Sequence, residues 1–241
     1  MLGAGRLSLI ASVQSIYDPY WGNVVLLLGF ENTLADASSA GSTVTATGTL
    51  NYNTGTFKFD TASGVLPAGA NYLNIANTGS FYFGTGDFTI ETWMNVPTGG
   101  WLTNTVNVMD ISQKLNGVQG GPSGMFLSTS SGASPTAYGV AFYDNTAIGF
   151  VANPTAVQIN SWTHICIGRQ GGVAYIGANG VLHSAGATSK NWFPYNVKIK
   201  QDGYNENGYT ARLDEFRVTN GVWRYGYGSR YDIPTARFPR Q

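Results

Sequence analysis

The sequence predicts an all-β domain built as a sandwich or a barrel. Short segments of β-branched and aromatic residues recur along the chain, and clusters of Gly, Asn, Ser and Thr separate them. With 32 Gly and 9 Pro among 241 residues, turns must be frequent and long helices are disfavoured. No segment keeps the 3.6-residue spacing of apolar residues that marks an amphipathic helix. One large domain fits this length.

Ten segments are expected to form strands, because each is rich in β-branched or aromatic residues and is bounded by turn-forming residues. In chain order they are Val24–Phe30, Thr56–Asp60, Tyr72–Ile75, Phe88–Val96, Tyr138–Tyr143, Ala147–Val151, Trp162–Arg169, Val173–Ala178, Val197–Lys200 and Leu213–Thr219. Residues 36–48 and 119–136, rich in Gly, Ser, Ala and Thr, are interpreted as surface loops. The pair Asn179-Gly180 predicts a tight hairpin turn after the eighth segment, because both residues tolerate positive φ.

Two of these segments are expected at the centre of the fold. In the first, Ile90 alternates with Glu91 and Trp93, and in the second, isoleucines alternate with His164 and Cys166. Both faces of each strand therefore carry groups that need cover, as in the middle of a two-layer sandwich. His164 is interpreted as a hydrogen-bonded core residue, and Cys166 as a small buried apolar residue.

Composition and charge exclude several classes of protein. Charged residues make up only 11% of the chain, and 13 Lys and Arg balance 13 Asp and Glu, so no global positive field attracts nucleic acid. The longest apolar run, Val24–Leu28, is far shorter than the roughly 20 residues that span a bilayer, so membrane insertion is not expected. Cys166 is the only cysteine, which excludes an intrachain disulfide.

The charges are unevenly placed along the chain. Residues 1–189 carry four cations and eight acids, whereas residues 190–241 carry nine cations and five acids. Six of the latter cations are arginines, namely Arg212, Arg217, Arg224, Arg230, Arg237 and Arg240. Two interpretations stay open. Either this basic segment docks the chain onto a partner, with Arg230, Arg237 and Arg240 as the candidates, or the arginines pair with acids of the same fold.

Three segments carry a family resemblance: Gly86 to Met94, Trp162 to Gly180, and Leu213 to Val218. In this order and spacing they resemble the concanavalin A-like lectin/glucanase jelly roll of the laminin-G-like type, and the resemblance extends from about Asp18 to Pro239. Two further stretches, one made of residues 18–21 and 24–28 and the other of residues 219–225 and 233–239, resemble the variety found in tailed-phage proteins. The resemblance implies an antiparallel two-sheet jelly-roll sandwich over residues 18–241. Its members bind sugars, cleave glucans or display a surface on a particle.

The carboxylates do not predict glycoside hydrolysis, which needs two acids that flank the scissile bond. Glu91 stands alone on its strand, and the adjacent Asp214 and Glu215 are expected to point to opposite faces of theirs. The two histidines, His164 and His183, accompany no Gly-x-Ser-x-Gly motif. We therefore expect no enzyme activity and no required cofactor.

Calcium is the one cofactor with some support, because jelly rolls of this type often hold it at loop ends. Asp202, Asn205 and Asp214 are the candidate ligands, since calcium prefers oxygen donors of this kind. The sequence favours an alternative. In this alternative, Asp214 lies on the same face as Phe216 and Val218 and accepts hydrogen bonds from loop amides, while the Asn and Gly residues shape the turn.

Sugar binding is predicted from aromatic residues in polar loops. Trp101, Trp192, Tyr204 and Tyr209 are candidate platforms for a sugar ring, although packing or loop anchoring is the commoner use of an aromatic side chain.

The N-terminal 17 residues lie outside the resemblance and are interpreted as a docking arm. Their apolar residues, too many for a freely solvated tail, include Leu7, Leu9, Ile10, Val13 and Ile16. The sequence thus predicts a non-enzymatic surface protein of a tailed-phage virion, either a capsid decoration protein or a component of the head fibre or tail. Its expected partners are other virion proteins, further copies of itself and glycans. The alternative is a calcium-assisted carbohydrate-binding module, free or secreted into the extracellular space.

Overall fold

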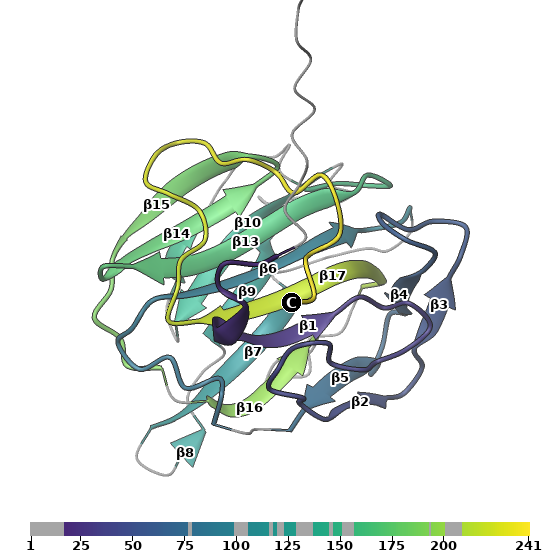
Figure 1. Ribbon diagram of the computed structural model, residues 1–241, viewed down its shortest axis with the longest axis horizontal. Coiled ribbons are helices and arrows are strands. Elements are labelled where there is room, and N and C mark those ends of the chain that lie inside the picture. Colours follow the sequence, from purple (N-terminus) through teal and green to yellow (C-terminus); the bar gives the residue numbers. More distant parts are fainter. Residues whose placement is uncertain are drawn as a thin grey trace, which may run out of the picture.

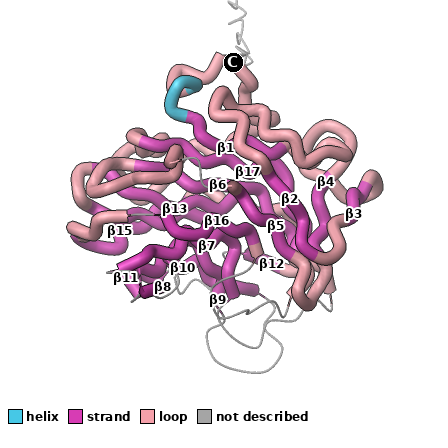
Figure 2. The backbone as a smooth tube through the Cα atoms, turned by 90° about the horizontal axis from the view of Figure 1, so that it is seen from below, coloured by secondary structure: helices cyan, strands magenta, loops and turns pink. Residues whose placement is uncertain are grey.

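The computed structural model describes residues 17–76, 79–98, 106–115, 118–119, 123–128, 137–144, 147–150, 157–192, 194–200 and 209–241. Within these ranges the chain forms 17 strands and one 3-10 helical turn, η1 (Trp21–Asn23). The strands lie in two stacked layers (Figures 1 and 2). All pairings between named strands are antiparallel, which confirms the expected all-β jelly-roll sandwich.

The first sheet contains eight strands among the described residues. Their order is β15 (Val181–Ala187), β14 (Val173–Ala178), β13 (Thr163–Gln170), β6 (Phe88–Asn95), β17 (Ala211–Asn220), β4 (Ser63–Leu66) and β3 (Asn51–Asn53), with β1 (Val24–Leu28) also paired to β17. The second sheet has the order β11 (Ala147–Phe150), β10 (Ala137–Asp144), β9 (Ser123–Ser128), β7 (Val106–Leu115), β16 (Pro194–Ile199), β5 (Tyr72–Ile75) and β2 (Val44–Thr47). Two short strands join its path, β12 (Val157–Gln158) beside β10 and β8 (Val118–Gln119) beside β7.

The hydrophobic core fills the space between the two sheets. Ile90, Ile165 and Phe216 enter it from the first sheet, and Phe142 and Ile199 enter it from the second. These side chains are almost completely buried. The alternation in β6 and β13 therefore has a structural reason. One face of each strand lies in the core between the sheets, and the other face is covered by a further segment of the chain.

Several expected strands are confirmed, and others differ from expectation. β5 and β14 have the predicted bounds, and Asn179 and Gly180 form the predicted turn between β14 and β15 with φ of 44° and 82°. The expected strand 56–60 is a loop, because the amides of Lys58 and Phe59 donate to the side chain of Asp214 instead of to a neighbouring strand.

Strands also occur where loops were expected. β2 lies within 36–48, and β9 lies within 119–136. The apolar run of β9, Met125–Leu127, is short and flanked by Gly and Ser, so the sequence does not mark it as a strand, and its hydrogen bonds come from β7 and β10 on its two sides.

A β-bulge changes the facing of residues in β17. The register shifts between Asp214 and Arg217, and Glu215 has a φ of 51°. Leu213 and Phe216 both enter the core, so the two residues between them turn away from it together. The expectation that Asp214 and Glu215 point to opposite faces, and that Asp214 shares a face with Phe216, is therefore wrong: one extra residue resets the alternation.

The outer face of the first sheet is covered by residues 221–241, here called the C-terminal strap (Figure 1). Trp223 of the strap stacks on Tyr175 with ring centroids 5.3 Å apart. Two glycines of the sheet make room for the strap. A Cβ atom at Gly168 would lie 2.5 Å from the Trp223 ring, and one at Gly177 would lie 2.9 Å from the Tyr231 ring.

The start and the end of the described chain meet on this same face. The amide of Asp18 donates to the carbonyl of Gln241 over 2.8 Å, and η1 lies beside the chain end in Figure 2. Phe238 of the strap packs with Val24 and Leu27 of β1 in a small separate apolar cluster. The strap is therefore held at both of its ends.

Candidate functional site

A buried carboxylate lies at the centre of the face beneath the strap. Glu91 of β6 is 0% exposed. Its Oε1 accepts a hydrogen bond from Nε of Arg217 over 2.9 Å, and its Oε2 accepts one from the Tyr225 hydroxyl and lies 3.2 Å from Nε2 of His164. Burial by itself raises the pKa of Glu91, but Arg217 and His164 hold it well below its usual range. Glu91 is therefore an ionised and fully partnered group.

The partners of His164 assign its tautomer. Burial lowers the pKa of the imidazole, which keeps the ring neutral at pH 7. Nε2 faces the Glu91 carboxylate and so carries the proton, while Nδ1 accepts from the Tyr231 hydroxyl over 2.9 Å. This confirms the expected hydrogen-bonded core histidine, and Cys166 on the same strand is likewise buried and free.

A second buried carboxylate connects the two ends of the chain. Asp18 accepts from Nη1 of Arg217 over 3.0 Å and forms a two-pronged pair with Arg224, with distances of 2.9 Å from Nη1 and from Nη2. The two arginines thus stand between Asp18 and Glu91, to which Arg217 is also bonded. The outer-face network consists of Asp18, Glu91, His164, Arg217, Arg224 and Tyr225.

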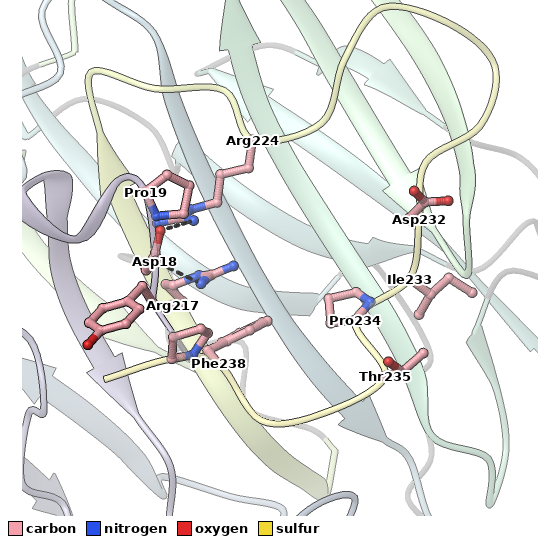
Figure 3. A pocket seen from close by; sticks show the side chains of 11 residues that line it. Asp18, Pro19, Arg217, Arg224, Asp232, Ile233, Pro234, Thr235 and Phe238 are labelled. Carbon is pink, nitrogen blue, oxygen red and sulfur yellow. Dashed lines mark hydrogen bonds and ion pairs between the residues drawn. The ribbon is translucent and has the colours of Figure 1, made fainter. Parts of the chain in front are cut away.

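Two cavities open beside this network. The first, of about 360 Å³, lies between residues 17–19 and strap residues 232–239, with Arg217 and Arg224 at its base (Figure 3). The second, of about 640 Å³, is lined by strap residues 224–233 and by the Asn179-Gly180 turn. Both cavities touch Arg224, Asp232 and Ile233, so they lie on either side of this part of the strap.

The remaining acids of the first sheet have structural partners. Asp214 accepts from the amides of Lys58 and Phe59, as the favoured interpretation of its sequence predicted. Burial raises its pKa to about 7, against the lowering effect of these two amides. Glu215 accepts from the amide of Phe238 and from Arg240. Neither Asp214 nor Glu215 lines either of the two cavities.

The candidate sugar platform is not assembled by the described residues. Trp192 and Tyr209 are both 0% exposed and belong to the core between the sheets. Their rings offer no free face to a ligand, so the expectation that they stack on a sugar is wrong. The other two platform residues, Trp101 and Tyr204, lie outside the described residues, as do the candidate calcium ligands Asp202 and Asn205.

The candidate docking residues fall into three groups. Arg237 forms an exposed pair with Asp60, and Arg240 pairs with Glu215, so for these two the pairing with acids of the same fold holds. Arg230 is exposed and lines the second cavity. The apolar arm residues Leu7, Leu9, Ile10, Val13 and Ile16 lie outside the described residues.

The sequence signals for the network were weak but present. Glu91 is the only charged residue of its strand, and Arg217 stands between the apolar residues Phe216 and Val218. A charge in such a position is rarely buried without a partner. Nothing in the sequence indicated that β6 and β17 are neighbours or that Asp18 reaches both arginines.

The described residues contain neither a metal-binding cluster of side chains nor a helix that could span a membrane. No group of three or more His, Cys, Asp and Glu side chains there is arranged to hold a metal ion. No helix in the described ranges has the length and apolar character needed to cross a membrane.

Comparisons with known proteins identify a family and a shared fold. Residues 67–223 match the profile of the Laminin_G_3 family, described as the concanavalin A-like lectin/glucanases superfamily. No curated protein sequence matches the chain. Many solved structures share its fold. One is the binding domain of Paraclostridial Mosquitocidal Protein 1, with 16% identity, a TM-score of 0.59 and coverage of 84% of this chain and 50% of that one.

Two further solved structures share the fold of this chain. The receptor-binding domain of botulinum neurotoxin type G has 17% identity and a TM-score of 0.57, and the match covers 83% of this chain and 48% of that one. Domain 4 of AbnA, an extracellular arabinanase of Geobacillus stearothermophilus solved in complex with arabinotriose, has 15% identity and a TM-score of 0.58, with coverage of 83% and 93%. The chain thus spans about half the length of the toxin domains and nearly all of the arabinanase domain.

Proposed function

Because the chain belongs to the concanavalin A-like lectin/glucanase superfamily, we propose that it is a non-catalytic glycan-binding module that is displayed on a particle surface. Its fold is that of a lectin-like, carbohydrate-binding-like domain. The similarity to solved toxin receptor-binding domains and to an arabinanase domain bound to arabinotriose supports a binding role.

The observation that carries the non-catalytic part of the proposal is that each carboxylate on β6 and β17 accepts hydrogen bonds from structural groups of the same chain. Glu91 is held ionised among fixed donors, and Asp214 and Glu215 accept hydrogen bonds from loop and strap groups. A glycosidase needs one acid that gives up a proton and a second that attacks or activates water, both open to substrate. These three carboxylates instead hold the strap and a loop in place.

The test is a paired measurement on the full chain. Binding is measured on an array of immobilised neutral and acidic oligosaccharides that includes arabinotriose, and hydrolysis of the same sugars is followed by release of reducing ends. We expect saturable binding to part of the array and no release. Turnover that depends on Glu91 would overturn the non-catalytic assignment, and absence of any binding would overturn the glycan-binding role.

We further propose that the particle is a tailed-phage virion and that the protein sits on its surface. The support is the sequence of the two end stretches, 18–28 and 219–239, which resemble those of tailed-phage proteins. These stretches also form one structural unit, since Asp18 of the first pairs with Arg224 of the second. In this assignment the apolar residues of the N-terminal arm dock the domain on other virion proteins, and copies of the chain assemble together. The alternative location is extracellular, as a free lectin.

Quantitative mass spectrometry of purified particles tests the location. A fixed, high ratio of this chain to the major capsid protein is expected for a decoration protein, and a few copies per particle for a fibre or tail component. Absence from particles would favour the free lectin. Deletion of residues 1–16 is expected to release the protein from particles while its glycan binding remains, which separates docking from ligand binding.

A further inference from the structure

We propose that the cavity of about 360 Å³ between residues 17–19 and strap residues 232–239 is a binding site for a neutral sugar. This inference rests on the proposed glycan-binding function and names the place where that function resides. The site lies on the outer face of the first sheet, and its lining includes none of the aromatic residues that the sequence singled out.

The first argument is a buried hydrogen-bond donor that faces the cavity. The side chain of Arg217 is only 7% exposed. Its Nε donates to Glu91 and its Nη1 donates to Asp18, while no described residue accepts a hydrogen bond from its Nη2. In Figure 3 the guanidinium points from Asp18 into the space toward Pro234. Nη2 is not among the buried side-chain atoms that lack a partner, so this donor opens onto the cavity, where a ligand oxygen can accept a hydrogen bond from it.

The second argument is the form of the cavity. Its apolar lining includes Pro19, Pro234 and Phe238. The Arg217 guanidinium lies over the Phe238 ring, with its central carbon 3.7 Å from the ring centroid. Tyr17 is 63% exposed at the rim. A few fixed polar groups among apolar and aromatic walls are the usual composition of a small-molecule site, and about 360 Å³ is within the range of such sites.

The third argument is the charge balance, which selects the class of sugar. Arg217 and Arg224 at the base of the cavity are matched by Asp18, to which both are bonded, and by Asp232 on the strap side. Behind them Glu91 adds a further negative charge. An acidic sugar would meet no excess of positive charge here, whereas a neutral sugar can accept from Arg217 through one hydroxyl and donate to Asp232 through another.

The test uses variants at the rim, because changing Arg217 itself would remove a charged partner from both buried carboxylates, Glu91 and Asp18, and so disturb the fold. Thr235→Trp fills the cavity from an exposed position, and Tyr17→Ala removes the exposed ring. Thr54→Trp is the matched control, an exposed threonine in a turn that lines neither cavity. Each variant is measured on an array of neutral oligosaccharides including arabinotriose and of sialylated and uronic acid glycans, and its folding is checked by its melting temperature.

We expect the wild type and Thr54→Trp to bind the same neutral glycans with equal affinity. The affinity of Thr235→Trp for these glycans should be at least tenfold lower, and that of Tyr17→Ala should be several-fold lower. Equal binding by Thr235→Trp and Thr54→Trp would overturn the proposed site while leaving the glycan-binding function intact. A strict preference for acidic glycans would overturn the assigned class of ligand. No binding by the wild type would overturn both the site and the function.

Discussion

Arg217 and Glu91 lie directly opposite each other on neighbouring strands, and the Arg217 side chain links Glu91 of β6 to Asp18 near the start of the described chain. A cross-strand pair of this kind normally stabilises a sheet by a fraction of a kcal/mol. Here both side chains are buried beneath the strap. Removing one of the two residues therefore leaves the charge of the other buried with one partner fewer.

Glu91→Ala should therefore be strongly destabilising. The change leaves Arg217 without one of its two acids and removes the acceptor of the Tyr225 hydroxyl, and we expect a loss of about 3 to 5 kcal/mol in the free energy of unfolding. Denaturant unfolding followed by tryptophan fluorescence measures it. Asp60→Asn is the control, because its pair with Arg237 is exposed and should contribute no more than about 1 kcal/mol. Similar losses in the two variants would contradict this account.

Asp214 should make the stability depend on pH. Its folded pKa of about 7 lies above the ordinary value of 3.8, mainly because of burial, so the folded state keeps a proton that the unfolded state has released. Stability should therefore fall as pH rises from about 4 to 7, by up to about 4 kcal/mol, and then level off.

The variant Asp214→Asn isolates this effect, because an amide cannot titrate. His164 gives an opposite slope: burial lowers its pKa below 6.5, so its contribution is complete above pH 6.5 and is lost as pH falls. The difference between wild type and Asp214→Asn removes the His164 contribution. Unfolding curves at several pH values should show that the free energy of unfolding of the variant rises relative to that of the wild type between pH 4 and 7. Parallel pH profiles would show that Asp214 titrates normally.

Arg169 should be a second buried charge on which the fold depends. It is 0% exposed and donates to the carbonyls of Gly84, Gly86 and Lys190 over 2.6 to 2.8 Å. Arg169→Met removes the guanidinium donor from all three carbonyls, of which, among the described residues, only that of Gly84 keeps another, the Trp192 amide. A loss of about 3 kcal/mol is expected in calorimetric or denaturant unfolding. Arg230→Met, at an exposed position, should stay within about 0.5 kcal/mol of the wild type. A small effect at Arg169 would mean that water replaces the guanidinium.

Gly168→Ala tests the fit between strap and sheet. The new methyl would meet the Trp223 ring and the backbone of β6, so either the strap or the strand must move, and a loss of about 1 to 3 kcal/mol or more is expected. Gly22→Ala places its methyl in open space and serves as the control. Limited proteolysis, read by mass spectrometry, should show cleavage within 221–241 in Gly168→Ala only. Equal protection of both variants would show that the strap adapts.

The sequence was sufficient to predict what depends on local pattern. The central strands β6 and β13 alternate in a way that requires cover on both sides, and the Asn179-Gly180 turn follows from the φ values that its residues tolerate. β9 was missed because its short apolar run, Met125–Leu127, lies in a stretch rich in Gly and Ser, and its strand pairing depends on β7 and β10 at its two sides. Composition alone does not show such neighbours.

The candidate site was less predictable than the fold. The facing of Asp214 and Glu215 was wrong because a single bulge resets the alternation of β17, and no residue type announces it. Trp192 resembled an exposed loop aromatic, yet it fills the core against Phe88 and Phe142. The outer-face network joins residues from opposite ends of the sequence, and their proximity is a property of the strand order.

The strap also decides how much of the chain must stay together for the domain to fold. The match to the family ends at residue 223. A fragment cut there would lack Tyr231, which packs against Gly177, and would leave Glu91 without Tyr225 and Arg224. Cutting the chain at the profile's first residue, 67, would remove β1 and Asp18 as well. The smallest unit that can be transplanted into another protein therefore begins before Asp18 and ends beyond Phe238.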